Sequence, residues 1–133
     1  MSDRLLHREL SYRIRGLLYE VHNELGRFAN EQQCGDSFEE KLKRQGINYI
    51  REFVIPSSFE GERKGRNKID FLIEGKIIVE LKHVKFLTKD NYYQCQRYLK
   101  ATRLELALLV NFRSTYLNIK RVLNYQQYNG SHP

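Results

Sequence analysis

Apolar side chains recur every three or four residues through the first part of the chain, a spacing that predicts an amphipathic helix over Glu9–Leu25. Gly26 follows directly, in the position where helices commonly end. After a polar, irregular stretch, Asp36 or Ser37 is predicted to cap a second helix that ends near Gly46. The N-terminal third is therefore predicted to form two helices.

The pattern then changes to short β-branched and apolar runs, which are typical of strands. A third helix is predicted over about Asn91–Ala101, with a cap at Thr88 or Asp90. The predicted strands are Tyr49–Ile55, Ile69–Ile73, Ile77–Leu81, Leu106–Phe112 and an edge strand over Tyr116–Val122, and the tail from Gln126 is predicted to be frayed. Because a helix connects them, the third and fourth strands are predicted to be parallel. The predicted fold class is α/β, with a mixed central sheet flanked by helices in a single domain over residues 1–133.

The predicted hairpin over Lys68–Lys82 carries three charges inside runs that are apolar enough to be buried, namely Asp70, Glu80 and Lys82. Buried charges are costly unless they are paired or bind a metal ion. Because side chains alternate between the two faces of a strand, Glu80 and Lys82 share one face. The three charges therefore need a chemical explanation.

The register of the hairpin decides whether Asp70 joins that face, because it does so only when it lies opposite Glu80. This register pairs Ile73 with Ile77 and leaves residues 74–76 as a three-residue loop, predicted as a type I turn followed by a bulge residue in the left-handed region. A two-residue loop would put Asp70 opposite Val79, on the wrong face. The predicted site therefore requires this one register.

Neighbouring carboxylates on one face of a hairpin repel each other unless a cation joins them. Oxygen ligands at this density suit a hard ion such as Mg²⁺ or Mn²⁺. Lys82 would direct its positive charge to the same place. The alternative is a solvated edge hairpin that carries an ordinary Glu–Lys pair.

The overall composition fits one soluble globular domain, with 41% hydrophobic and 29% charged residues in a chain of 133. The net charge of +7 favours a polyanionic partner such as nucleic acid, although solubility alone also accounts for it. The charged start and the lack of a long apolar run predict a cytoplasmic protein with no membrane partner. Cys34 and Cys95 are expected to be reduced, and the scattered histidines argue against zinc.

An aspartate followed ten residues later by Glu-x-Lys resembles the PD-(D/E)XK nuclease signature, and further motifs make the resemblance more specific. Over about Leu10–Leu123, the chain resembles the GxxExxY proteins, a small bacterial branch of that superfamily. The matching stretches are Glu20–Gly26, Glu39–Leu42, Ile69–Ile73, Ile78–Lys82, Gln94 with Tyr98–Ala101, and Leu108–Phe112. The naming motif itself departs from the pattern, since Cys34 stands in place of the tyrosine and Phe28 in place of the glycine. The resemblance implies a restriction-endonuclease-like αβββαβ core.

The same resemblance implies a metal-dependent site on the hairpin. Asp70 and Glu80 would bind Mg²⁺ or Mn²⁺, with the backbone carbonyl of Leu81 as a third ligand. The ion would lower the pKa of a bound water and stabilise charge on the phosphate. Lys82 would orient or deprotonate that water, or hold the developing oxyanion.

Residues outside the hairpin are weaker candidates for the site. Gln94 would bind the metal-held water and Tyr98 would hydrogen-bond Lys82 or a phosphate, because the two share one helix face; the alternative is plain solvent exposure on a helix. Glu39 is a candidate fourth carboxylate, with a surface pair to Lys43 as its alternative, and Glu31 is a weaker candidate still. Candidate phosphate contacts, each alternatively a solvated cation, are Arg63, Lys64, Arg66, Lys85 and Arg97.

Two functions of different classes fit these features. The first is a metal-dependent nuclease that hydrolyses phosphodiester bonds of DNA or RNA. The second is a non-catalytic nucleic-acid-binding or accessory module that keeps the nuclease fold, within a defence or mobile-element system. The presence of Asp70, Glu80 and Lys82 together favours the first. The absence of a separate recognition domain points to modest sequence specificity, or to a homodimer or partner protein that supplies it.

Overall fold

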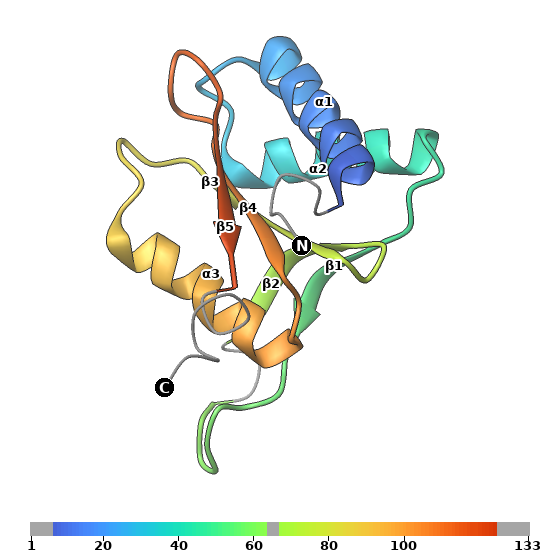
Figure 1. Ribbon diagram of the computed structural model, residues 1–133. Coiled ribbons are helices and arrows are strands. Elements are labelled where there is room, and N and C mark those ends of the chain that lie inside the picture. Colours follow the sequence, from blue (N-terminus) through green and yellow to red (C-terminus); the bar gives the residue numbers. More distant parts are fainter. Residues whose placement is uncertain (1–6, 64–66, 125–133) are drawn as a thin grey trace.

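The computed structural model describes residues 7–63 and 67–124 (Figure 1). Its elements follow the predicted order of two helices, three strands, a helix and two strands. They are α1 (Arg8–Leu25), α2 (Glu31–Arg44), β1 (Tyr49–Val54), β2 (Lys68–Ile73), β3 (Ile77–Lys82), α3 (Lys89–Thr102), β4 (Leu106–Asn111) and β5 (Asn118–Leu123). The tail from Gln126 lies outside the described residues.

The five strands form one mixed sheet in the order β1-β2-β3-β4-β5, with β5 at an edge as predicted. β3 and β4 are parallel and connected by α3, which confirms the predicted crossover. One core cluster lies between the sheet and the pair α1 and α2, and a second lies between the sheet and α3 (Figure 1). The sheet is therefore covered by helices on both faces, which explains why β3 and β4 are almost continuously apolar.

The start of α2 differs from the prediction, because the helix begins at Glu31 and the predicted caps lie inside it. Asn30 caps the helix by accepting from the Gln33 backbone N–H at 2.8 Å, and the Gln33 side chain accepts from the Asn30 N–H at 2.9 Å. This reciprocal pair is a capping box. Gly35, a poor helix former, lies within the helix at a buried position where the Arg51 side chain packs closely against it.

We expect Asn30→Ala to lower the free energy of unfolding by about 1 kcal/mol, because the Gln33 N–H then loses its acceptor. Chemical denaturation monitored by circular dichroism measures this change. Gln32→Ala is the matched control, since Gln32 is exposed in the same turn of the helix. Equal stability of the two variants would contradict a capping role for Asn30.

The β2–β3 hairpin has the predicted register, with Ile73 opposite Ile77 and a three-residue connection. The predicted turn type is wrong. The Lys76 N–H donates to the Ile73 carbonyl at 2.9 Å, and both intervening residues, Glu74 (φ 54°) and Gly75 (φ 65°), have positive φ. Two positive φ values are the pattern of a type I′ turn, whose twist matches that of the flanking strands.

Two further expectations concern cysteines and membrane spans. Cys34 and Cys95 are both free, as predicted, and both are buried. Burial raises the pKa of Cys34 to about 11 and that of Cys95 to about 12, so both thiols stay protonated near neutral pH. Within the described residues, no helix combines the length and apolarity that a bilayer crossing requires.

Candidate active site

The ladder between β2 and β3 stops at the Phe71–Val79 pair, one position before Asp70 and Glu80. Beyond that point the carboxylates of Asp70 and Glu80, instead of backbone carbonyls, accept hydrogen bonds from backbone N–H groups of the neighbouring strand. The Asp70 N–H donates to Glu80 Oε2 at 2.7 Å, and the Leu81 N–H donates to Asp70 Oδ2 at 2.8 Å. Each carboxylate thus accepts a hydrogen bond from the opposite strand, and the two acids are held together where the strands separate.

This pair carries an electrostatic cost that no ion pair within the described residues offsets. Glu80 is only 2% exposed, and neither it nor Asp70 forms an ion pair with any described residue. Burial, followed by the charge of Asp70, raises the pKa of Glu80 to about 8. Burial also raises the pKa of Asp70. The site therefore favours binding of either a proton or a cation between the strands.

Lys82 lies at the end of β3, where its ammonium group donates to Gln94 Oε1 at 2.8 Å. Its positive charge opposes the rise in pKa of both Asp70 and Glu80, so it acts on the same two carboxylates. Gln94 comes from α3 and is half-buried. The structure thus brings together five of the residues that the sequence selected, namely Asp70, Glu80, Leu81, Lys82 and Gln94.

Tyr98 is placed differently from its predicted role. It is 3% exposed and packs in the core cluster under α3 beside Ile78 and Leu109. Burial, followed by the charges of Glu80 and Asp70, raises the pKa of Tyr98 to about 12. Among the described residues, its hydroxyl group makes no hydrogen bond to Lys82, whose ammonium is taken by Gln94. Tyr98 therefore lies close to the carboxylates but forms part of the wall behind them.

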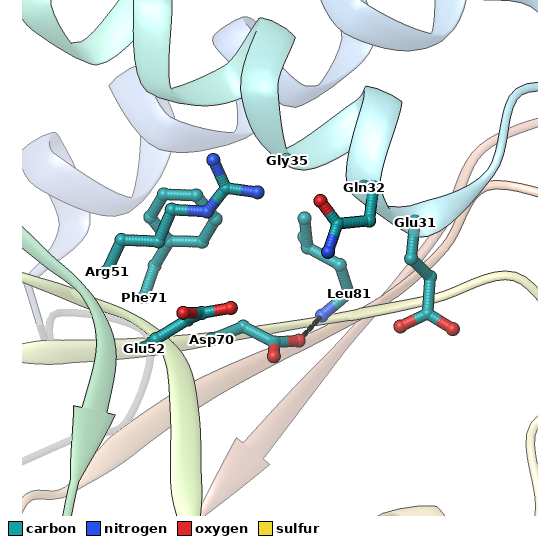
Figure 2. Close-up of a pocket in the computed structure, with 8 residues that line it drawn as sticks. All are labelled: Glu31, Gln32, Gly35, Arg51, Glu52, Asp70, Phe71 and Leu81. Atoms are coloured by element: carbon teal, nitrogen blue, oxygen red, sulfur yellow. Dashed lines mark hydrogen bonds between the residues drawn. The ribbon is translucent and has the colours of Figure 1, made fainter.

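A pocket opens between the start of α2 and the open end of the β2–β3 hairpin, where the two strands separate. Asp70 lies at its floor (Figure 2). Glu31 and Gln32 reach it from the first turn of α2, Leu81 lies between Asp70 and Gln32, and Arg51 and Phe71 lie on the opposite side. The charge of Glu31 contributes to the raised pKa of both Asp70 and Glu80. In a strand, the N–H and C=O of one residue point to the same edge, so the Leu81 carbonyl points toward Asp70 like its N–H.

Glu39, the predicted fourth carboxylate, belongs to a neighbouring cluster instead. Its Oε2 accepts from the Tyr49 hydroxyl at 2.6 Å, and its Oε1 accepts from Arg51 Nη1 at 3.0 Å. Arg51 also donates to Asp36 Oδ1 at 2.7 Å. The hydrogen bond from Tyr49 is the main reason that the pKa of Glu39 is lowered. Glu39 is thus a satisfied anion, and Glu31 is the helical carboxylate that lines the pocket with Asp70.

Two charged pocket residues, Arg51 and Glu52, were not selected from the sequence. The guanidinium group of Arg51 lies 5.4 Å from the centre of the Phe71 ring and lines the pocket from β1. A signal for it existed, since Arg51 falls in phase with the apolar positions Tyr49 and Phe53 of an alternating strand. A cation at an inward-facing strand position is a candidate for a function.

The β1–β2 ladder skips Glu52 and Asp70, which lie between the Arg51–Phe71 and Phe53–Ile69 pairs, and Glu52 has a φ of 55°, which is unusual for a residue other than glycine. At this place β2 changes the face it presents, since Phe71 packs under α1 and α2 whereas Ile69 packs under α3. The irregularity releases Asp70 from the ladder. Sparsely populated backbone conformations cluster at functional sites, and no sequence pattern signals this one.

The candidate phosphate contacts have different outcomes. Arg63, Lys85 and Arg97 are exposed. The ammonium group of Lys85 lies 5.8 Å from the centre of the Phe86 ring. Lys64 and Arg66 lie outside the described residues. Those that are described therefore remain open to solvent and to a polyanion.

A family profile described as the PD-(D/E)XK nuclease superfamily matches residues 8–122. The mixed sheet with flanking helices and the acidic pair at the divergent hairpin agree with this match. The chain belongs to the PD-(D/E)XK nuclease superfamily. No curated protein and no solved structure matches the chain at a significant level.

The superfamily implies a divalent metal ion, and the chemistry of this site fits one. Two neighbouring carboxylates with raised pKa values, of which Glu80 is buried, and no ion-paired cation among the described residues favour a hard divalent cation. Within the described part of the chain, no three His, Cys, Asp or Glu side chains are grouped to hold a metal. The protein ligands would therefore be Asp70, Glu80 and the Leu81 carbonyl, with water filling the remaining positions, as Mg²⁺ prefers.

Proposed function

We propose that this protein is a Mg²⁺- or Mn²⁺-dependent nuclease that hydrolyses phosphodiester bonds of DNA or RNA. The observation that carries the proposal is the interlocked Asp70–Glu80 pair, which lies beside Lys82 at the point where β2 and β3 separate. The two backbone hydrogen bonds that this pair accepts do not explain it, because the mutual repulsion of the carboxylates destabilises the metal-free fold. Cation binding and catalysis account for it.

Each residue has a role that follows from its surroundings. Asp70, Glu80 and the Leu81 carbonyl would hold the ion, which supplies an acidified water and neutralises phosphate charge. Gln94 holds the Lys82 ammonium in place through its 2.8 Å hydrogen bond. From there Lys82 orients the attacking water or stabilises the oxyanion that develops on the phosphate.

Within the superfamily, we propose that the chain lies in the GxxExxY branch. The glutamate of the naming motif corresponds to Glu31, which lines the pocket with Asp70. We propose Glu31, rather than Glu39, as the acidic helical residue of the site. Cys34, in the tyrosine position, is fully buried, so it contributes packing and no polar group to the pocket.

The proposal is tested by incubating the purified chain with labelled single-stranded DNA, duplex DNA and RNA in Mg²⁺, Mn²⁺ or EDTA. We expect metal-dependent cleavage of at least one substrate, and we expect Asp70→Asn to lower its rate by at least ~10²-fold, since the ion loses a charged ligand. Asp90→Asn, an exposed carboxylate on α3, is the matched control. Binding without cleavage in every condition would support the accessory-module alternative.

A further inference from the structure

Three loops meet beside the ends of β3 and β4 and form one surface. They are residues 26–30 between α1 and α2, residues 83–88 between β3 and α3, and residues 112–117 between β4 and β5. His83 Nε2 is hydrogen-bonded to the Arg27 carbonyl at 2.7 Å, and Arg27 Nε donates to the Arg113 carbonyl at 3.2 Å. Figure 1 shows the third loop, in orange-red, beside the first. We call these segments the three-loop surface.

Each loop of the three-loop surface presents one aromatic ring to solvent. Phe28 is 84% exposed, Phe86 is 72% exposed and Tyr116 is 86% exposed, which makes them three of the four most exposed large hydrophobic side chains in the described part of the chain. Rings of this size normally bury most of their area in a core or an interface. Three of them on adjoining loops indicate a surface that contacts a partner.

A cation accompanies the ring in each of the three loops. The Arg27 guanidinium lies 5.1 Å from the centre of the Phe28 ring, and the Lys85 ammonium lies 5.8 Å from that of Phe86. The third loop carries the exposed Arg113. None of the three segments contains an aspartate or a glutamate. The three-loop surface is therefore both aromatic and positively charged, which complements a polyanion that also offers flat rings.

We propose that the three-loop surface binds single-stranded nucleic acid and directs it to the Asp70–Glu80 site. This inference names the substrate class of the proposed nuclease. For the cleavage step it rests on the proposed function. Unpaired bases stack on Phe28, Phe86 and Tyr116, while Arg27, Lys85 and Arg113 contact phosphates. A duplex hides its base faces, so only unpaired nucleotides use the rings. The second loop begins at His83, directly after Lys82, so a strand held on the surface lies next to the site.

The first experiment measures binding of a fluorescent single-stranded oligonucleotide and of its duplex, by anisotropy in EDTA so that no cleavage occurs. We expect the wild type to prefer the single strand and the variant Phe28→Ala/Phe86→Ala/Tyr116→Ala to lose at least tenfold in affinity, since stacking is worth this much per base. The three side chains are exposed, so the fold is kept, as thermal unfolding will verify. The matched control is Tyr12→Ala/Phe59→Ala, which removes two exposed rings elsewhere, the first of them on α1.

The second experiment tests the charges of the three-loop surface. Lys85→Glu/Arg113→Glu is expected to weaken single-strand binding and to flatten its dependence on salt, because fewer counterions are released. The control Lys43→Glu/Lys100→Glu makes the same charge change in the last turns of α2 and α3, and we expect it to have a smaller effect.

Several outcomes would overturn the inference. The first is equal binding of the single strand by the aromatic variant and the wild type, and the second is a wild-type preference for the duplex. The third is that removal of the rings abolishes self-association, or binding to anionic lipid vesicles, and leaves oligonucleotide binding unchanged. The two proposals fail separately. A wild type that binds single strands through these rings but never cuts refutes only the nuclease, whereas an aromatic variant that cuts single strands with unchanged KM refutes only the three-loop surface.

Discussion

Alanine in place of Lys82 is expected to lower the rate of phosphodiester cleavage by about 10²- to 10⁴-fold while the fold stays intact. Lys82 lies at the end of β3, half-exposed, and its ammonium makes one hydrogen bond to Gln94. The loss of that bond costs little stability. In the role that we propose for Lys82, its charge acts on the reacting phosphate or water, so its loss should raise the barrier more than it weakens the fold.

Two companion variants separate the charge of Lys82 from its position. Lys82→Met keeps the length of the side chain without the charge, so it should be as slow as the alanine variant. Gln94→Ala removes the acceptor that positions the ammonium, and a smaller reduction in kcat is expected because the charge remains. Lys76→Ala, at the exposed turn of the same hairpin, is the control and should cut at the wild-type rate. Cleavage by Lys82→Ala at that same rate would place the activity elsewhere.

The register of the hairpin was predictable because the alternation of side chains in a strand and the need to place both carboxylates on one face select the same pairing. Side chains alternate in a strand, so the requirement that Asp70 lie opposite Glu80 selected one register, and the structure has it. The turn type was not predictable in the same way. Glu74 takes a positive φ that its residue type disfavours, because the twist of two well-paired strands decides the geometry of the turn.

The start of α2 shows where local rules fail. Gly35 and its polar neighbours resemble a loop in sequence, yet the helix runs through them because Asn30 and Gln33 form a capping box and Gly35 leaves room for Arg51. That contact joins residues 16 positions apart, which no window of helical periodicity detects. The missed helical turn carries Glu31, so the pocket could not be completed from sequence.

Arg51 and Glu31 explain why the helical carboxylate was hard to choose. Both Glu31 and Glu39 lie on α2, and sequence alone leaves them as alternatives. Arg51 resolves the choice in the structure, because it pairs with Glu39 at 3.0 Å and so neutralises that carboxylate. Glu31 has no such partner among the described residues and adds to the negative charge that acts on Asp70. The pairing of Arg51 with Glu39 therefore leaves Glu31 as the helical carboxylate that makes the pocket negative.

Glutamine in place of Glu80 is expected to make the metal-free protein more stable at pH 8. The folded state holds the pKa of Glu80 at about 8, above its usual 4.5, so between these values the folded protein binds more protons than the unfolded chain. Stability of the wild type must then fall as pH rises through this window, because deprotonation costs more in the folded state. The glutamine side chain is neutral at every pH and keeps an oxygen that can accept the Asp70 N–H, so the Glu80→Gln variant escapes this loss.

Thermal unfolding in EDTA at pH 5 and pH 8 measures the effect of Glu80→Gln. At pH 8 the variant should exceed the wild type by at least about 1 kcal/mol, or roughly 4 °C in Tm, and at pH 5 the difference should shrink. Added Mg²⁺ or Mn²⁺ should raise the Tm of the wild type at pH 8 and leave that of the variant nearly unchanged, because the variant lacks a ligand charge. Glu60→Gln, an exposed carboxylate in the loop after β1, should match the wild type throughout. A variant that is no more stable at pH 8, or that the ion stabilises equally, would contradict both the buried charge and its role as a metal ligand.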